Sequence, residues 1–130
     1  MDYKFENWNT KAVLDITEGA NGQFIRVIHT DTTTGTTTDF QYLLCKREAN
    51  RVIAVIEAHV AGESKVGDRI KMSTVNGDVK TSLVVTILKP NCVAIDVMRK
   101  VKGNEAVASR FLLYGSRQPM RVLKDLRGCD

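Results

Sequence analysis

The side chains with the right types for catalysis or metal binding are few and far apart in this chain. Two histidines are present, His29 and His59, and neither has a cysteine, histidine or carboxylate at metal-ligand spacing. His29 and Asp31 would share one face of a strand, as an acid–base pair requires, but Asp31 is explained more simply as the polar end of a hairpin. The sequence has no nucleotide-binding glycine loop and no hydrolase nucleophile motif. We therefore predict no enzyme activity, no metal site and no cofactor.

Basic side chains at alternate positions indicate a different chemistry, the binding of phosphate groups. Three expected strands carry these cations, which are Arg51, Arg69, Lys71 and Lys80, with Arg47 near the edge. Hydroxyls on the same faces would add hydrogen bonds to phosphate. Those hydroxyls belong to Ser73, Ser82 and Thr86. The alternative is a solvated face without a partner, because charged side chains normally occupy the wet side of a sheet. The net charge of +4 favours anionic partners only slightly.

Turn-forming residues recur about every 8–12 residues, a spacing that is typical of an antiparallel β-meander. Asn76-Gly77 is the clearest turn, because a two-residue hairpin turn needs a positive φ at both central positions. Between the turns, apolar and polar residues alternate, which indicates a sheet covered on one side. We predict one α+β domain of mainly antiparallel β-structure. It would have an N-terminal hairpin over about 10–31, a roughly five-stranded sheet over 36–101 and one or two helices within 104–128.

Two segments fit more than one kind of element. Residues 47–61 match a helical stripe, but the density of β-branched residues favours a strand from Arg51 to Val60. Residues 106–114 suit either a helix or a last strand. The C-terminal helix is better defined, because Pro119 fits a first helical turn and Gly128 fits a stop.

The length and the cysteines limit the class of protein. A chain of 130 residues has the length of one domain. No apolar run is long enough to cross a membrane, and the first residues lack the pattern of a signal peptide. Three widely spaced cysteines, Cys45, Cys92 and Cys129, predict a reducing compartment and not a disulfide framework. A disulfide between subunits through Cys129 remains open.

The order of these elements resembles the coat proteins of single-stranded RNA phages of the levivirus type. The similar stretches are 12–15 and 22–24 as a hairpin, and 40–51 running into 52–60. That family has an N-terminal hairpin, a five-stranded sheet and two helices exchanged across a dimer. The resemblance implies a homodimer that assembles into a virion in the host cytoplasm and binds single-stranded RNA on the polar face of its sheet. By strand parity, the residues facing the RNA would be Gln41, Arg47, Arg51, His59, Arg69, Lys71 and Lys80.

A second resemblance leads to a different class of function. The segment from His29 to Gly35, followed by Phe40 and Tyr42, is similar to the aspartate-glycine segment of hotdog-fold acyl-CoA thioesterases. It implies that Asp31 is the general base or nucleophile of thioester hydrolysis. A sheet protein that binds only protein partners is a third hypothesis.

Overall fold

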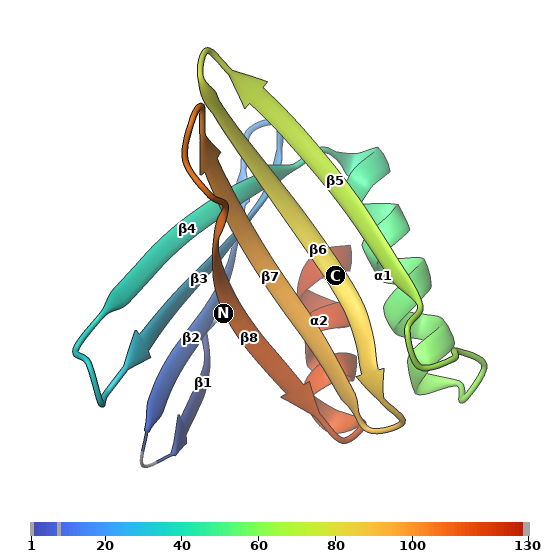
Figure 1. Ribbon diagram of the computed structural model, residues 1–130. Helices are drawn as coiled ribbons and strands as arrows, with labels where there is room; N and C mark the ends of the chain where they lie inside the picture. Colours follow the sequence, from blue (N-terminus) through green and yellow to red (C-terminus); the bar gives the residue numbers. More distant parts are fainter. Residues whose placement is uncertain (1, 8, 129–130) are drawn as a thin grey trace.

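The chain runs twice through four strands followed by a helix (Figure 1). The computed structural model describes residues 2–7 and 9–128. The first unit consists of β1 (Asp2–Asn7), β2 (Thr10–Gly19), β3 (Gly22–Asp31), β4 (Thr37–Leu44) and α1 (Lys46–Val60). The second unit consists of β5 (Arg69–Asn76), β6 (Val79–Lys89), β7 (Cys92–Val101), β8 (Val107–Tyr114) and α2 (Arg117–Arg127).

Each unit forms its own antiparallel sheet with the strands in chain order. We call β1–β4 sheet A and β5–β8 sheet B. Figure 1 shows the strands of sheet A crossing the direction of the strands of sheet B, with α1 alongside β5. The predicted class, α+β with mainly antiparallel strands, is confirmed. The expected single sheet of about five strands is replaced by two sheets of four, and the predicted hairpin over 10–31 is the β2–β3 pair.

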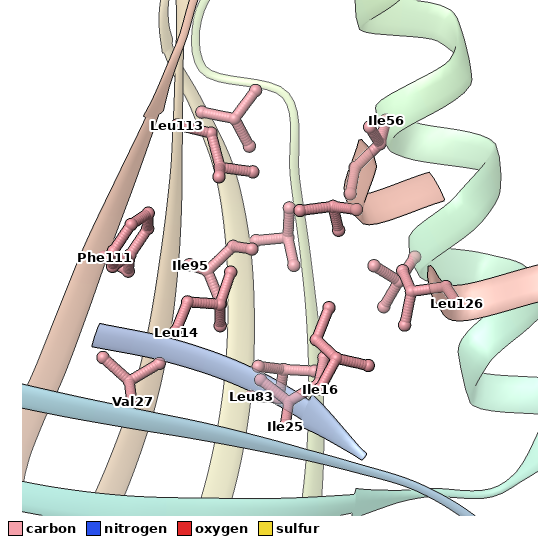
Figure 2. Packing of buried hydrophobic residues seen from close by; sticks show 14 of the residues in the cluster. Leu14, Ile16, Ile25, Val27, Ile56, Leu83, Ile95, Phe111, Leu113 and Leu126 are labelled. Carbon is pink, nitrogen blue, oxygen red and sulfur yellow. The ribbon is translucent and has the colours of Figure 1, made fainter. Parts of the chain in front are cut away.

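The core lies between the two sheets and the helices. Alternate residues of each strand are buried, as the period of a pleated strand requires. Figure 2 shows these side chains meeting: Leu14 and Val27 come from sheet A, Ile95 and Phe111 from sheet B, and Ile56 from α1. The opposite face of each sheet is therefore turned away from this core.

Strand β8 joins the two sheets. It contacts β2, β3 and β4 of sheet A as well as its partner β7. The fully buried hydroxyl of Ser109 lies 2.7 Å from the carbonyl oxygen of Val27 and 3.2 Å from that of Thr38. Because buried polar groups are costly when left unpaired, this contact fixes the position of sheet B against the β3–β4 edge of sheet A.

The strand predicted from Arg51 to Val60 is wrong, because these residues belong to helix α1. The helix begins after Cys45, whose backbone amide donates to the carboxylate of Glu48 three residues later. This is a capping box, although cysteine is not among the usual capping residues. The buried residues recur at helical spacing and are Ala49, Val52, Ile53, Ile56 and His59. Packing of this stripe on the sheets outweighs the β-preference of the individual residues.

The C-terminal region is a strand followed by a helix. Residues 107–114 form β8, which decides the ambiguity over 106–114 in favour of a strand. The helical region predicted over 104–128 is therefore confined to α2, with Pro119 in its first turns and Gly128 just beyond its end. Gly128 has a φ of 85°, a conformation that suits glycine at a helix end.

Candidate nucleic-acid interface

A group of unpaired positive charges lies on the outer face of sheet B, the face turned away from the core. We call this surface the basic face. Its cations are exposed and come from all four strands: Arg69, Lys71, Lys80, Lys100 and Arg110. Within β5–β8, Asp96 is the acid that shares this face. The alternation that predicted Arg69, Lys71 and Lys80 on one polar face therefore agrees with their positions.

The register of the strands sets the layout of the basic face. One row crosses the sheet from Lys71 through Val84 and Asp96 to Arg110. Lys80 pairs directly with Lys100 toward the end of the sheet formed by the β5–β6 and β7–β8 turns. Because neighbouring strands are about 4.8 Å apart, Lys71 and Arg110 stand roughly 14 Å apart across the sheet. The cations thus lie around the margin of the face.

The charge of Asp96, the one acid of this face, is neutralised by an ion pair with Arg110 on the adjacent strand. Asp96 is only 5% exposed, and both of its carboxylate oxygens accept hydrogen bonds from Arg110, at 2.7 and 3.1 Å. The hydrogen bonds that Arg110 donates to this carboxylate raise the pKa of Arg110 above its ordinary value. Arg69, Lys71, Lys80 and Lys100 have no ion pair within the described part of the chain. These four charges are therefore free to meet an external anion.

The centre of the basic face is made of small, hydroxyl and apolar side chains. Ser73 and Ser82 share a hydrogen bond of 2.7 Å across β5 and β6. Met98 and Leu112 are half-buried on β7 and β8, and Tyr114 is 42% exposed at the far end of β8. A floor of this kind, surrounded by cations, can accept flat apolar rings while charged groups pair at its margin.

Helix α1 continues the positive charge beyond the edge strand β5. Arg47, Arg51, Ala54 and Ala58 follow one stripe of the helix, because they are spaced by three or four residues. Ala54 and Ala58 line a shallow hollow together with Arg69 at the start of β5. Arg47 and Arg51 therefore share the side of α1 that carries the two alanines beside Arg69. These two predicted residues border the basic face without being part of it.

Two predicted site residues lie elsewhere. His59 is buried on α1 at 8% exposure, with its Nδ1 atom 3.5 Å from the Ser64 hydroxyl, so its expected exposure on a strand is wrong. The error follows from assigning a strand where the chain forms a helix. Gln41 is exposed on β4 of sheet A and lines a groove between the two sheets. Lys100 and Arg110 were missed, although the strand register places them on the same face as Lys80.

The groove beside Gln41 is a second polar surface, of about 340 Å³. Its lining residues come from the edge strand β4 and from the inner face of sheet B near the turns: Asp39, Phe40, Gln41, Thr74, Asn76, Val79, Thr81 and Arg99. Asp39 is held by Arg26, whose Nε donates to it at 2.7 Å, and this hydrogen bond lowers the pKa of Asp39. Arg99 forms no ion pair with any described residue.

The acid–base arrangement considered for Asp31 is explained by a turn. The Oδ1 atom of Asp31 accepts the backbone amide of Thr33 at 2.8 Å, which is the hydrogen bond of an Asx-type turn. The His29 ring contacts the Thr10 hydroxyl at 2.8 Å. Asp31 thus stabilises the β3–β4 connection, and the thioesterase hypothesis is not supported.

No clustered metal ligands and no membrane-crossing helix were found among residues 2–7 and 9–128. Groups of three or more histidine, cysteine, aspartate or glutamate side chains that could hold an ion do not occur there. None of the described helices is long and apolar enough to span a bilayer. Cys45 is exposed and Cys92 is buried, each with a free thiol. The disulfide considered for Cys129 lies outside the described residues.

Comparison with solved structures identifies the fold. No protein-family model and no curated protein matches the sequence. The structure is similar to WHY3 from Arabidopsis thaliana, with a TM-score of 0.68, 6% identity, and coverage of 98% of this chain and 84% of that one. The chain shares the fold of these plant proteins. WHY1 from the same plant gives a TM-score of 0.63 at 6% identity, with 98% and 86% of the two chains covered. The plant transcriptional regulator PBF-2 gives 0.58 at 8% identity, with 98% and 78% covered.

This likeness overturns the resemblance to phage coat proteins. This chain places a helix after its fourth strand and divides its strands into two sheets, whereas the coat fold has one five-stranded sheet before both helices. The predicted capsid function and virion location are therefore wrong. The resemblance to coat proteins was inferred because both folds contain a run of antiparallel strands and a C-terminal helix. Helix α1 distinguishes them, and its residues were assigned to a strand.

Proposed function

We propose that this protein binds single-stranded nucleic acid across the basic face of sheet B. The observation that carries the proposal is the set of four cations, Arg69, Lys71, Lys80 and Lys100, which are exposed on one sheet face without ion partners among the described residues. Phosphate groups are the anions that such a distributed set of charges fits best. Ser73, on the same face, offers a hydroxyl donor to phosphate oxygens.

The floor of the basic face favours a single strand over a duplex. In a duplex the bases are stacked inside, so that only phosphates and groove edges reach a flat protein surface. A single strand exposes its base faces, which can lie on Met98, Leu112 and the ring of Tyr114. Arg47 and Arg51 would extend the phosphate contacts along α1. The fold is compatible with this function, since PBF-2 is a plant transcriptional regulator.

The proposal includes self-association through the two helices. Between α1 and α2 lies a groove of about 420 Å³, lined by Val60, Ala61, Leu123 and Met120, which is 55% exposed. Its rim carries both signs of charge. Glu57 on α1 pairs with Arg127 on α2 at 2.8 Å, and Lys124 on α2 has no ion partner among the described residues.

A second copy of this chain is the occupant that suits the helix groove. In a two-fold dimer the same patch faces itself, so α1 of one copy can face α2 of the other. Glu57 of each copy would then approach Lys124 of its partner, and Met120 would enter the apolar part of the groove. The helices would thus pack across a dimer, and each dimer would carry two basic faces for one long strand.

The binding function is tested with the native protein by fluorescence anisotropy. Labelled DNA and RNA single strands of the same sequence, about 20 nucleotides long, are compared with the DNA duplex. We expect a single strand to bind more tightly than the duplex. The logarithm of the affinity should fall with the logarithm of salt concentration with a slope at least as steep as about −3, since each of the four unpaired cations of the basic face contributes about 0.7. Equal binding of the duplex, or an affinity that does not change with salt, would contradict the proposal.

A further inference from the structure

The end of sheet B formed by the β5–β6 and β7–β8 turns is basic on both of its faces. We call this end the tip. Lys80 and Lys100 point to the basic face, whereas Arg99 belongs to the alternate face that lines the inter-sheet groove. Lys102 lies in the β7–β8 turn. Two acids, Asp78 and Glu105, lie in the two turns, so the four cations leave the tip positive.

Exposed apolar side chains accompany these charges at the tip. Val75 at the end of β5 is 69% exposed and Val107 at the start of β8 is 48% exposed. Val101, between Lys100 and Lys102, is also exposed. Exposed aliphatic groups beside unpaired cations give a surface on which bases can rest while phosphates stay in contact with charge. The tip therefore connects the basic face with the groove on the other side of sheet B.

The groove itself combines the groups that hold an unpaired base. Phe40 pairs in register with the buried Val27, so its half-buried ring is directed to the same side as the core, toward sheet B. Asn76, on the inner face of sheet B, brings an amide, which both donates and accepts hydrogen bonds, and Gln41 borders the groove from the edge strand β4. Arg99, without an ion partner in the described structure, brings a charge for the adjoining phosphate. The groove thus has an aromatic wall, a hydrogen-bonding amide and a cation.

We propose that a single strand bound to the basic face passes over the tip and places one nucleobase in the groove, against the ring of Phe40. This inference rests on the proposed function, because the strand must first be held by the basic face. The base edge meets the amide of Asn76, and the phosphate of that nucleotide meets Arg99. The groove then supplies the base preference of the protein, because edges are read by hydrogen bonds whereas the basic face contacts mainly phosphates.

The test uses a single strand that carries one fluorescent base analogue, 2-aminopurine, at successive positions. Stacking on an aromatic ring quenches this analogue. At one position we expect quenching by the native protein that is lost with Phe40→Leu, a change that keeps the apolar bulk but removes the aromatic ring. The affinity of that variant should fall at least about fivefold, as expected for the loss of one stacked base. The matched control is Phe24→Leu, since Phe24 is half-buried in the same sheet but lies on its outer face.

Arg99→Gln provides an independent variant in case Phe40→Leu does not fold. It should weaken binding and lower the salt slope by about 0.7, one phosphate contact on a single strand. Quenching that is unchanged in both Phe40→Leu and Arg99→Gln, while neutralising Arg69 and Lys71 still weakens binding, would overturn the groove site and leave the proposed function standing. A native protein that binds no single strand would overturn both.

Discussion

Changing Arg69 and Lys71 together to glutamine should weaken the binding of a single strand about 25-fold at roughly 0.1 M salt. Each phosphate contact with a single strand contributes about 0.7 to the salt slope, so the loss of two contacts makes the slope about 1.4 shallower. If the variant and the native protein bind equally at 1 M salt, the affinity of the variant at roughly 0.1 M is then lower by about 1.4 logarithmic units. Both side chains are exposed on the edge strand β5 and have no ion partner among the described residues. Their replacement should leave the core, and with it the free energy of unfolding, nearly unchanged.

The matched control for this variant is the pair Lys4→Gln and Lys11→Gln. These lysines occupy the outer face of sheet A, and removing them lowers the net charge by the same amount. Anisotropy titrations at several salt concentrations give both the affinity and the slope. If the two double variants lose affinity equally, only the overall charge matters, and the assignment of binding to sheet B is wrong.

Introducing a charge at Met120 should separate the subunits and weaken binding to long strands. Met120 is 55% exposed in the apolar helix groove, so Met120→Glu would place a carboxylate where the second copy is expected to pack. Met120→Lys should have the same effect. Equal loss with either sign of charge would show that the apolar contact, and not a repulsion between like charges, is what matters. Sedimentation should then show a monomer. Affinity for a strand long enough to reach two subunits should fall by about 100-fold or more, because the second binding event is no longer intramolecular.

Short strands distinguish this effect from damage to the binding face. A strand that covers only one subunit should bind the Met120 variants as tightly as the native protein. Leu43→Glu is the control for an added charge at an exposed apolar position, since Leu43 lies on the outer face of sheet A. Unchanged sedimentation of both Met120 variants would show that the helix groove is not the self-association surface.

The sequence predicted side-chain positions best in strands that have one solvent-exposed face. From Arg69 to Ser73 of β5, and around Lys80 of β6, charged or hydroxyl residues share the face opposite the apolar core positions, so the exposed positions of Arg69, Lys71 and Lys80 could be assigned from parity. The same face extends to Lys100 and Arg110. They were missed because most residues of β7 from Cys92 to Met98 are apolar on both faces, and because residues 106–114, which include Arg110, also suited a helix.

Helix α1 could not be assigned from the same kind of pattern. Its β-branched residues suit a strand, and its capping residue, Cys45, is not one of the side chains that normally identify a helix start. Once this segment is taken as a strand, His59 is placed on an exposed face instead of in the core. The division into two sheets depends on long-range contacts such as the hydrogen bond of Ser109 with Val27. Local periodicity in the sequence does not show such contacts, so the division could not be predicted.

The measurement that tests the central claim most directly is an amide NMR titration of the native protein with a short single strand. We expect the largest chemical-shift changes at residues of the basic face, in particular Lys71, Ser73, Ser82 and Arg110, with the outer face of sheet A unaffected. Changes confined to sheet A or to the α1–α2 groove would contradict the assignment of binding to the outer face of sheet B.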